Sequence, residues 1–461
     1  MMVKRNALIS ILLALFFMMS VASVGAVDVK FRGSYYVRGV YESNHSLLDD
    51  SEQSTAFFHQ RVRIGTVFQV SPGLALHTRF DAVEKIWGDN NWAGSRSNVS
   101  ERSHEGGNKY TLERENIEFE VVYVQYYSPI GIWRVGYVPH DTQWGTIWGT
   151  SERMVPMIQW TLPINTNFTI GAKYMKNVDG SYSAFTETTA TDTDKDSYSA
   201  VIVYKQDNLD MGFKWAYLDS RETRDKDNYM SSGHLLTPYI IWGIGQVKLQ
   251  AELEYFYGKR DYDNGNPDID MRAWSAYFNG ELVQGSFALG ATVAYASGDD
   301  PDTTNKFEGL PDSAFSCWGG LDYDPGLILW NDDRNEWIGP LKGNGSTRTT
   351  VRSGVSNALL FLVYVSYRPT EKLDFKATWL YAKADEKPTM DGKPSSLTNP
   401  KFVDDEYGHE LDIIATYQIT NNLSYMVGAG YLWTGDYFKG TDRNAKIDDN
   451  YLVTHKLTLI F

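Results

Sequence analysis

The sequence predicts an all-β protein, a transmembrane antiparallel up-and-down β-barrel of about 18 strands. Three observations predict it: apolar and polar residues alternate along many runs of about ten residues, short and long connectors strictly alternate, and the chain ends on a phenylalanine. The composition agrees, because aromatic residues make up 14% of the 461 residues while the mean hydropathy is −0.38, which excludes a helical membrane protein.

Residues 1–26 have the pattern of a Sec-type signal peptide. Lys4 and Arg5 precede a 13-residue apolar run from Ala7 to Met19, and Val24-Gly25-Ala26 supplies small residues before the expected cleavage point. The run is shorter than the roughly 20 residues that span a bilayer, which disfavours a membrane anchor. We therefore expect a mature barrel of residues 27–461, with a net charge of −15 − 2 = −17.

The strand assignments depend on apolar and polar residues that alternate with a period of two. From Val247 to Tyr255, apolar side chains stand at odd positions and polar ones at even positions, and residues 29–38, 58–70 and 373–381 alternate in the same way. A β-sandwich would show the same alternation, so the choice between the two folds depends on the connectors.

Connector length favours the barrel. Short turns near 71–73, 128–131, 163–167, 207–210, 243–246, 283–286, 369–372 and 420–423 alternate with long polar loops near 42–56, 87–114, 139–153, 179–196, 219–233, 259–270, 298–352, 385–406 and 435–450. Eight turns and nine loops make 17 connections and hence 18 strands, with both chain ends on the short-turn side. Outer-membrane barrels show this asymmetry of periplasmic turns and extracellular loops.

The last strand places Phe461 on the same face as Val453, Leu457 and Leu459. A terminal phenylalanine on such a strand resembles the assembly signal of Gram-negative outer-membrane barrels. This implies that the outer-membrane assembly machinery is a partner through Phe461. It also implies that the barrel lies in the cell outer membrane after Sec export, in contact with the lipid bilayer and lipopolysaccharide.

A family resemblance covers about 30 residues near the C-terminus. Gly408-His-Glu410-Leu-Asp412 is followed by Tyr417, by Gly428-Ala-Gly430-Tyr431 and by Gly435-Asp436, and this pattern resembles the C-terminal pattern of the alginate-export family. The resemblance implies an 18-stranded monomeric channel. It does not imply that alginate is the solute.

Strand parity identifies the side chains that face the lumen. The predicted inner wall carries 13 basic and 8 acidic residues, an excess of +5 inside an acidic protein. We take as candidate pore-lining or substrate-contacting residues Arg32, Arg38, Arg61, Arg63, Arg79, Arg134, Lys214, Lys376, Glu410 and Asp412.

Two interpretations of the arginines remain open. In the first, the five from Arg32 to Arg79 stand unpaired on one wall and give a mild preference for anions, such as acidic oligosaccharides, because a guanidinium binds carboxylate or phosphate through two parallel hydrogen bonds. In the second, the arginines and acids form ion-pair ladders that stiffen the wall. Glu118 and Glu120 on the fourth strand are the acids placed to pair with Arg79 or Arg134.

The loop 298–352 is unusually apolar for a segment in water, since it holds Trp318, Trp330 and Trp337 among glycine and proline. We expect it to fold into the pore as a constriction, or else to lie across the pore mouth. Its Cys317 is the only cysteine and is expected to be an inert small residue.

Two further segments have alternative interpretations. Trp144, after the fifth strand, either stacks on a sugar or belongs to a structured turn at the rim. The acidic loops at 192–196 and 261–268 have oxygen ligands at a calcium-like spacing but depart from the EF-hand pattern, so we favour solvated loops. No cofactor is expected, and the metal site stays unassigned.

The composition and motifs narrow the function. A net charge of −15 disfavours nucleic acid as a partner, and none of the eight histidines has a serine or aspartate at a spacing that predicts an enzyme. Strands that begin near Val29 leave no room for the plug of a TonB-dependent importer. The expected function is a porin-like channel for small hydrophilic solutes, and the alternative is a structural or adhesive barrel without a transport role.

Overall fold

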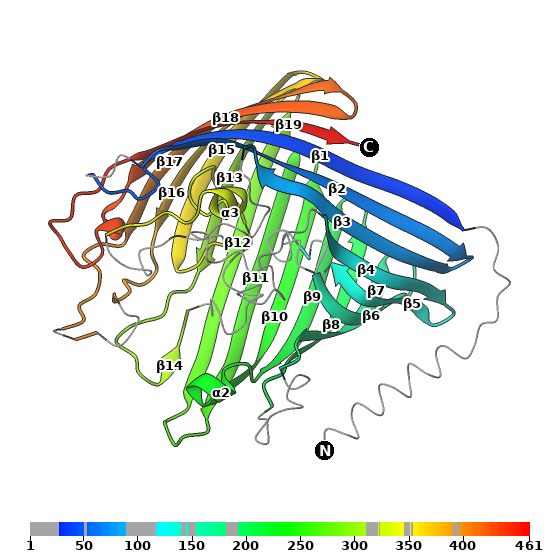
Figure 1. Cartoon of the computed structure of the whole chain (residues 1–461), viewed down its shortest axis with the longest axis horizontal. Helices are drawn as coiled ribbons and strands as arrows, with labels where there is room; N and C mark the ends of the chain where they lie inside the picture. The colour runs from blue at the N-terminus through cyan, green and yellow to red at the C-terminus, as the bar shows by residue number, and fades with distance from the viewer. Residues whose placement is uncertain are drawn as a thin grey trace.

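The computed structural model describes residues 27–49, 53–88, 117–139, 144–145, 154–180, 192–309, 321, 323–344, 351, 354–390, 395–396 and 398–461. Within these residues, 18 antiparallel strands form one closed barrel, so the predicted fold class is confirmed. The barrel closes where β1 (Asp28–Ser43) pairs with β19 (Asn450–Ile460), as Figure 1 shows.

Every wall strand pairs with its neighbours in chain order. Between β1 and β19 the wall consists of β2 (Thr55–Ser71), β3 (Leu74–Ile86), β4 (Ile117–Ser128), β5 (Gly131–Pro139), β6 (Met154–Pro163), β7 (Phe168–Val178), β8 (Lys195–Gln206), β9 (Leu209–Ser220), β10 (Tyr229–Ile244), β11 (Val247–Tyr262), β12 (Ile269–Gln284), β13 (Phe287–Ala296), β15 (Ala358–Thr370), β16 (Leu373–Lys383), β17 (Glu406–Thr420) and β18 (Leu423–Thr434).

The remaining elements belong to the long connectors. The two-residue strand β14 (Lys306–Phe307) pairs in parallel with β12 and does not join the wall. The helices α2 (Arg224–Asp227) and α3 (Asp332–Trp337) and the 3₁₀ helix η2 (Asp436–Lys439) are short. Among the described residues, no helix has the length and apolar character needed to cross a membrane.

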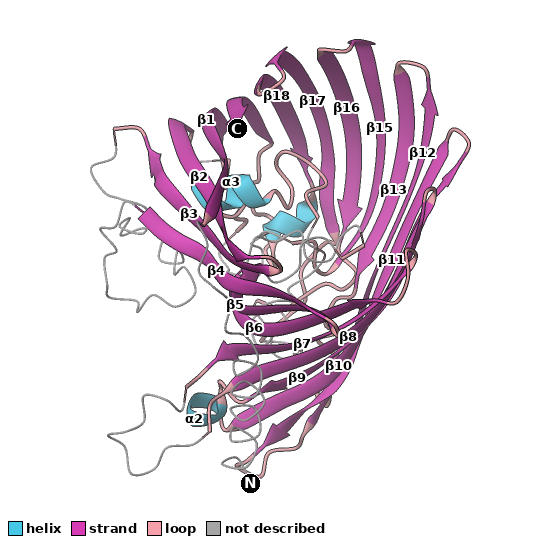
Figure 2. Cartoon of the chain, turned by 90° about the vertical axis from the view of Figure 1, so that its right-hand side faces the viewer, coloured by secondary structure: helices cyan, strands magenta, loops and turns pink. Residues whose placement is uncertain are grey.

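Tight turns and long connectors alternate as the sequence predicts, and both ends of the wall lie on the tight-turn side. Figure 2 shows the strands as a continuous curved wall around an interior that holds the helix α3. The signal peptide predicted for residues 1–26 lies outside the described residues.

Side chains alternate between the two faces of the wall. Phe31, Phe119 and Leu289 are 69%, 62% and 61% exposed on the outer face, whereas Glu254 and Thr454 are buried on the inner face. An apolar outer surface with polar groups inside is the pattern of a barrel that faces lipid outside and water inside.

Phe461 packs at the seam where the barrel closes. The Phe461 N–H donates to the Gly33 carbonyl at 2.9 Å, and the Gly33 N–H donates to the Phe461 carbonyl at 2.7 Å. A Cβ atom on Gly33 would lie 2.6 Å from the Phe461 ring and 2.7 Å from the Arg63 carbonyl oxygen. The missing side chain of Gly33 therefore makes room for the terminal ring.

We expect deletion of Phe461 to reduce the fraction of assembled barrel sharply, and Gly33→Val to reduce it less, because valine displaces the ring from its seat. Heat-modifiable mobility on SDS gels measures the assembled fraction. Gly280→Val is the matched control, since a Cβ there has only an ordinary contact, 3.7 Å from Leu249. Full assembly of both the Phe461 deletion and Gly33→Val would contradict this role of the seam.

Candidate functional site

Part of the loop predicted at 298–352 lies inside the barrel. Residues 323–344, which we call the insert, contact inward-facing side chains of β1, β2 and β17. Figure 2 shows α3, which belongs to the insert, enclosed by the wall on the side of β1, β2 and β17.

Two wall carboxylates hold one end of the insert through its backbone. Glu410 accepts hydrogen bonds from the N–H groups of Ile328 at 2.8 Å and Leu329 at 2.9 Å, and Asp412 accepts one from Leu327 at 3.2 Å. Both carboxylates are buried, so these bonds form away from bulk water.

The glycines of the C-terminal motif make room for this contact. A Cβ on Gly430 would lie 2.6 Å from Asp412 Oδ1 and 3.3 Å from the Leu327 Cβ, and a Cβ on Gly428 would lie 3.3 Å from the Leu327 side chain. Gly428 and Gly430 therefore form a flat floor on β18 beneath the insert.

The helix α3 holds the other end of the insert. Asn331 caps the helix by accepting the Arg334 N–H at 2.9 Å. The Arg334 side chain then reaches Glu42 on β1, with its Nε 3.1 Å from both carboxylate oxygens, and both side chains are fully buried. Asn450 on β19 also donates to Glu42, at 2.9 Å, so this carboxylate ties the insert to both strands of the seam.

A second ion pair joins α3 to β1 with the charges reversed, because here the wall supplies the cation and the helix supplies the anion. Arg38 on β1 pairs with Asp333 and also donates to Thr454 on β19 at 2.8 Å. Burial disfavours the charged carboxylate, but Arg38, with Lys456 and His59, outweighs burial and lowers the pKa of Asp333 below its usual range. Asp333 is therefore ionised at neutral pH and completes the pair.

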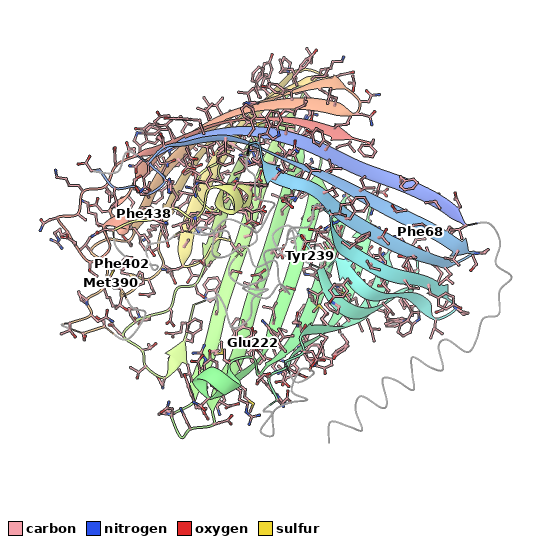
Figure 3. All side chains as sticks on the ribbon, in the orientation of Figure 1. Phe68, Glu222, Tyr239, Met390, Phe402 and Phe438 are labelled. Carbon is pink, nitrogen blue, oxygen red and sulfur yellow. The ribbon has the colours of Figure 1, made fainter. Side chains whose placement is uncertain are left out.

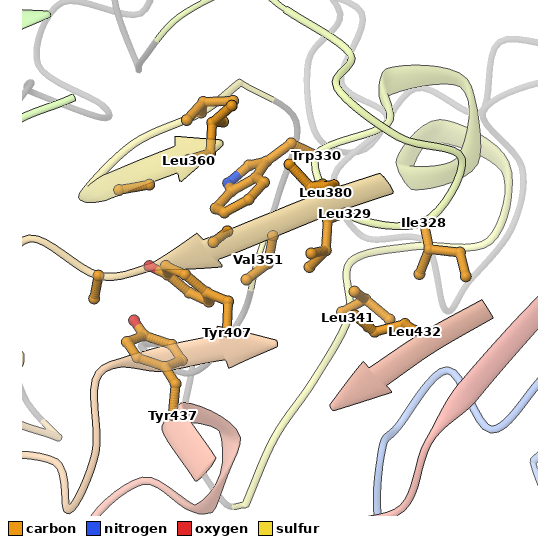
Figure 4. Packing of buried hydrophobic residues seen from close by; sticks show 14 of the residues in the cluster. Ile328, Leu329, Trp330, Leu341, Val351, Leu360, Leu380, Tyr407, Leu432 and Tyr437 are labelled. Carbon is orange, nitrogen blue, oxygen red and sulfur yellow. The ribbon is translucent and has the colours of Figure 1, made fainter. Parts of the chain in front are cut away.

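Aromatic packing fills the space between the insert and the wall. Trp337 stacks on His59 of β2 with ring centroids 4.1 Å apart, and Trp330 meets Tyr407 of β17 edge to face at 5.0 Å. Figure 4 shows Trp330 among Leu360, Leu380 and Tyr407. This apolar cluster occupies the side of the interior bounded by β12, β13 and β15–β19.

Neighbouring loops close over the same cluster. Phe402, after β16, and Phe438, in η2, are buried within it, and Met390 packs against it (Figure 3). Leu47 from the loop after β1 joins them, with its carbonyl accepting the Asp448 N–H at 3.1 Å. The loops therefore cover the insert from the long-loop end.

Trp144 lies inside the barrel and not at its rim. It is 8% exposed, packs edge to face on Tyr239 at 5.0 Å and donates its Nε1–H to the Thr237 carbonyl at 3.0 Å, both on β10. A buried indole cannot offer a free stacking face, so the interpretation of Trp144 as a sugar platform is wrong. The neighbouring residues 140–143 lie outside the described residues.

Most of the five arginines from Arg32 to Arg79 form ion pairs with carboxylates. Arg63 donates to Asp81 at 2.7 Å, Arg61 lies 3.7 Å from both Asp81 and Glu84, and Arg79 pairs with Glu120. With Arg38 on Asp333, four of the five arginines predicted to be unpaired have a carboxylate partner. The first interpretation, unpaired arginines, is therefore wrong for these four, because acids on β3, β4 and the insert lie close enough to pair with them, and the second interpretation, an ion-pair ladder, describes this wall.

Three basic candidates have no carboxylate oxygen within 4 Å in the part of the chain that the structure describes, although Lys376 interacts with Asp412 electrostatically over a longer distance. They are Arg32, Arg134 and Lys376, each within four residues of the tight-turn end of its strand. Arg134 donates to Gln125 at 2.9 Å, and Lys376 lies 4.8 Å from the centre of the Tyr364 ring. Lys214, the remaining basic candidate, is buried in the wall of β9.

Sequence reasoning missed the residues that dock the insert. Glu42 occupies an inward position but stands at the boundary between the first strand and its loop, so it was not among the candidates. Asp333 and Arg334 lie in the loop, where strand parity assigns no direction. The run Asn331-Asp332-Asp333 is a helix-start signal from which α3 could have been predicted.

The acidic loops pair with basic side chains. Asp192 lies 2.6 Å from Arg221, Asp194 lies 2.6 Å from Lys176, and Asp268 lies 2.7 Å from Lys259. Within the described residues no group of side chains has the arrangement of a metal site. Trp318 and Cys317 lie outside the described residues.

The barrel is similar to solved structures of proteins from two Pseudomonas species. A BenF-like porin from Pseudomonas fluorescens Pf-5 matches with a TM-score of 0.50 at 12% identity, over 94% of this chain and 99% of that one. Pseudomonas aeruginosa OccK8 (OprE) and OccK10 (OpdN) match with the same TM-score at 13% and 12% identity, over 94% of this chain and 98% and 99% of theirs.

At this identity the likeness concerns the fold. No protein-family model matches the sequence, and no curated protein matches it. The resemblance of residues 408–438 to the alginate-export family therefore has no support from these comparisons, although the motif glycines Gly428 and Gly430 have a structural role in seating the insert.

Proposed function

We propose that this protein is an outer-membrane channel of the porin type that passes small hydrophilic solutes and prefers anions. One observation carries the proposal: the wall closes on itself with an apolar outer surface, while ionised side chains stand along its inner face. Charged groups on the inside of a membrane barrel require water or partners, and a water-filled lumen supplies a path for solutes. One of the similar solved structures is described as a BenF-like porin.

The same arrangement supports the membrane orientation. The tight turns and both ends of the wall face the periplasm, and the long loops face the outside. Phe461, seated at the seam, is the residue that the assembly machinery would recognise after Sec export. The barrel then stands in the outer membrane as a monomer, surrounded by lipid and lipopolysaccharide.

The insert is the proposed constriction. Trp330 and Trp337 belong to its buried face, and Trp318 precedes it in the same loop. Because the insert and its apolar cluster occupy one side of the interior, solutes pass on the other side. A narrow passage also reduces the screening of wall charges by salt, which in wide aqueous pores acts over about 8–10 Å.

The anion preference rests on Arg32, Arg134 and Lys376. The paired arginines contribute little net field, because each has a carboxylate beside it. The three basic groups outside any ion pair lie near the periplasmic end and attract carboxylates, phosphates and sulfates, and Asp412 offsets part of the charge of Lys376. Acidic oligosaccharides are among the solutes that this chemistry favours.

A structural barrel is the second candidate, and a specific observation favours it. Twenty-five buried residues form the apolar cluster around the insert, so part of the interior is packed like the core of a soluble protein. An interior packed across its whole width would not conduct. Conductance distinguishes the two candidates.

Reversal potentials across planar bilayers in a potassium chloride gradient test the selectivity. We expect the wild type to prefer chloride mildly. In Arg32→Gln/Arg134→Gln/Lys376→Gln the permeability ratio falls to about one or below, because the uncompensated positive charges are gone.

The matched control is Arg79→Gln/Glu120→Gln, which removes a wall ion pair without changing the net charge. We expect it to keep the wild-type ratio. A wild-type channel that prefers potassium would show that acidic loops control entry, and the acidic solutes would then drop out of the proposal.

A further inference from the structure

The outer surface of the wall carries a hollow at the long-loop end of β9–β12. Its volume is about 280 Å³, and its lining includes Tyr217, His234, Tyr257, Lys259, Asp270 and Arg272. Figure 2 shows these four strands side by side, with α2 at their loop end.

The strand register arranges the lining as two rows. Tyr217, His234, Tyr257 and Arg272 are direct cross-strand neighbours on four successive strands, so they form one row on the outer face. Ser232, Lys259 and Asp270 form a second row, two residues closer to the loops. Gly233, Gly258 and Met271 lie between the rows, and the backbone at these positions forms the floor.

The first row is an aromatic surface with a cation at its end. The His234 ring lies 5.0 Å from Tyr217 and 5.0 Å from Tyr257, measured between ring centroids. Trp215 donates to His234 Nδ1 at 3.2 Å, which orients the imidazole. Arg272 is exposed beside Tyr257 and has no carboxylate partner in the described part of the chain.

The second row is polar, and its cation already has carboxylate partners within the protein. Lys259 lies 2.9 Å from Asp261 and 2.7 Å from Asp268, so its charge is already compensated. Ser232 and Asp270 present hydroxyl and carboxylate oxygens of the kind that bind sugar hydroxyls. The aromatic row offers faces for sugar rings, and Arg272 offers a planar fork for phosphate.

The position of the hollow on the barrel indicates which kind of ligand it can bind. It is on the lipid-facing side, within one to five residues of the ends of β10, β11 and β12 that lead to the long loops. In the proposed orientation these ends lie at the headgroup level of the outer leaflet, where aromatic girdles of membrane barrels stand. A ligand at this level is a lipid headgroup and not a solute in transit.

We propose that this hollow binds the phosphorylated sugar headgroup of an outer-leaflet glycolipid. Arg272 holds a phosphate, Tyr257 and Tyr217 pack against a sugar ring, and Ser232 and Asp270 bind its polar groups. The proposal rests on the membrane orientation given above but not on conduction, so a barrel that conducts nothing could still bind the lipid.

The test measures binding of lipid A, a diglucosamine lipid with two phosphates, to the intact barrel in detergent by native mass spectrometry. We expect Arg272→Gln to weaken binding about tenfold, the effect of losing a charge-assisted bidentate contact. Tyr257→Leu also weakens binding, because it keeps the apolar area but removes the ring. Arg443→Gln, an exposed loop arginine away from these strands, is the matched control and keeps the wild-type affinity.

Two comparisons make the result specific. Dephosphorylated lipid A binds the wild type about as weakly as lipid A binds Arg272→Gln, whereas phosphatidylglycerol, which has phosphate but no sugar, binds weakly to both proteins. Equal binding of lipid A to the wild type and to Arg272→Gln overturns the proposal. The proposal is also overturned if phosphatidylglycerol binds as tightly as lipid A, because that result would show a basic surface that binds any anionic lipid. Heat-modifiable mobility confirms that each variant is folded.

Discussion

Replacement of residues 324–340 by a short Gly-Ser linker is expected to raise single-channel conductance severalfold. The removed stretch contains α3 and Leu327–Trp330, which together fill one side of the interior. Conductance follows the narrowest cross-section, so emptying that side widens the path. Recordings of single channels in planar bilayers measure the change.

The control for this deletion shortens a loop outside the barrel. Residues 263–267, between β11 and β12, are exposed, and their replacement by a tighter turn leaves the lumen unchanged. Both variants are first checked for folding by heat-modifiable mobility. Unchanged conductance in a folded insert deletion would place the solute path away from the insert and remove its role as the constriction.

Arg334→Ala is expected to destabilise the docked insert by about 3–5 kcal/mol, because it leaves the fully buried Glu42 carboxylate without its counter-ion. Glu42 still accepts from Asn450, but one neutral donor does not compensate a buried charge. The insert should then leave its seat. Hydrogen exchange at the N–H groups of residues 327–329, which are bonded to Glu410 and Asp412, should accelerate strongly.

A second variant distinguishes the buried charge from a general packing defect. In Arg334→Met/Glu42→Leu both charges are gone and the volume is largely kept, so most of the lost stability returns. Lys401→Ala, which breaks the exposed pair with Asp302, is the control and costs at most about 1 kcal/mol. Equal exchange in Arg334→Ala and the wild type would show that the ion pair does not hold the insert.

The strand count and the direction of each wall side chain could be predicted from the sequence. Successive side chains of a wall strand point to opposite faces of the wall. Arg38, Arg63 and Glu410 were therefore assigned to the lumen from their positions in the alternating pattern, and the structure places them there. Connector lengths gave the number of strands because a closed barrel places every loop of one kind at the same end.

Strand parity does not give the distance between side chains on neighbouring strands. For this reason the sequence could not decide which lumenal arginines have a carboxylate partner. Arg63 and Asp81 face each other across β2 and β3, and the bulge at Gln60/Val62 shifts the register beside them. A pattern that assigns a face to each residue cannot say which carboxylate lies within 4 Å, so the sequence left both interpretations of the arginines open, and the structure shows that four of the five are paired.

The insert was beyond prediction for a different reason. Its contacts join residues far apart in the chain, as Glu42 and Arg334 do, and no local period places a loop against a wall. The apolar content of residues 298–352 indicated only that the loop must be covered. Which wall covers it depends on Gly428 and Gly430, whose role becomes visible once the strands are assembled.

The central claim is that a water-filled path remains beside the insert, and single-channel recording of the purified wild-type barrel tests it most directly. At symmetric potassium chloride we predict discrete, ohmic conductance steps from preparations whose heat-modifiable mobility shows a folded barrel. A folded barrel that inserts into the bilayer yet gives no steps would contradict the claim and would leave the structural barrel as the function.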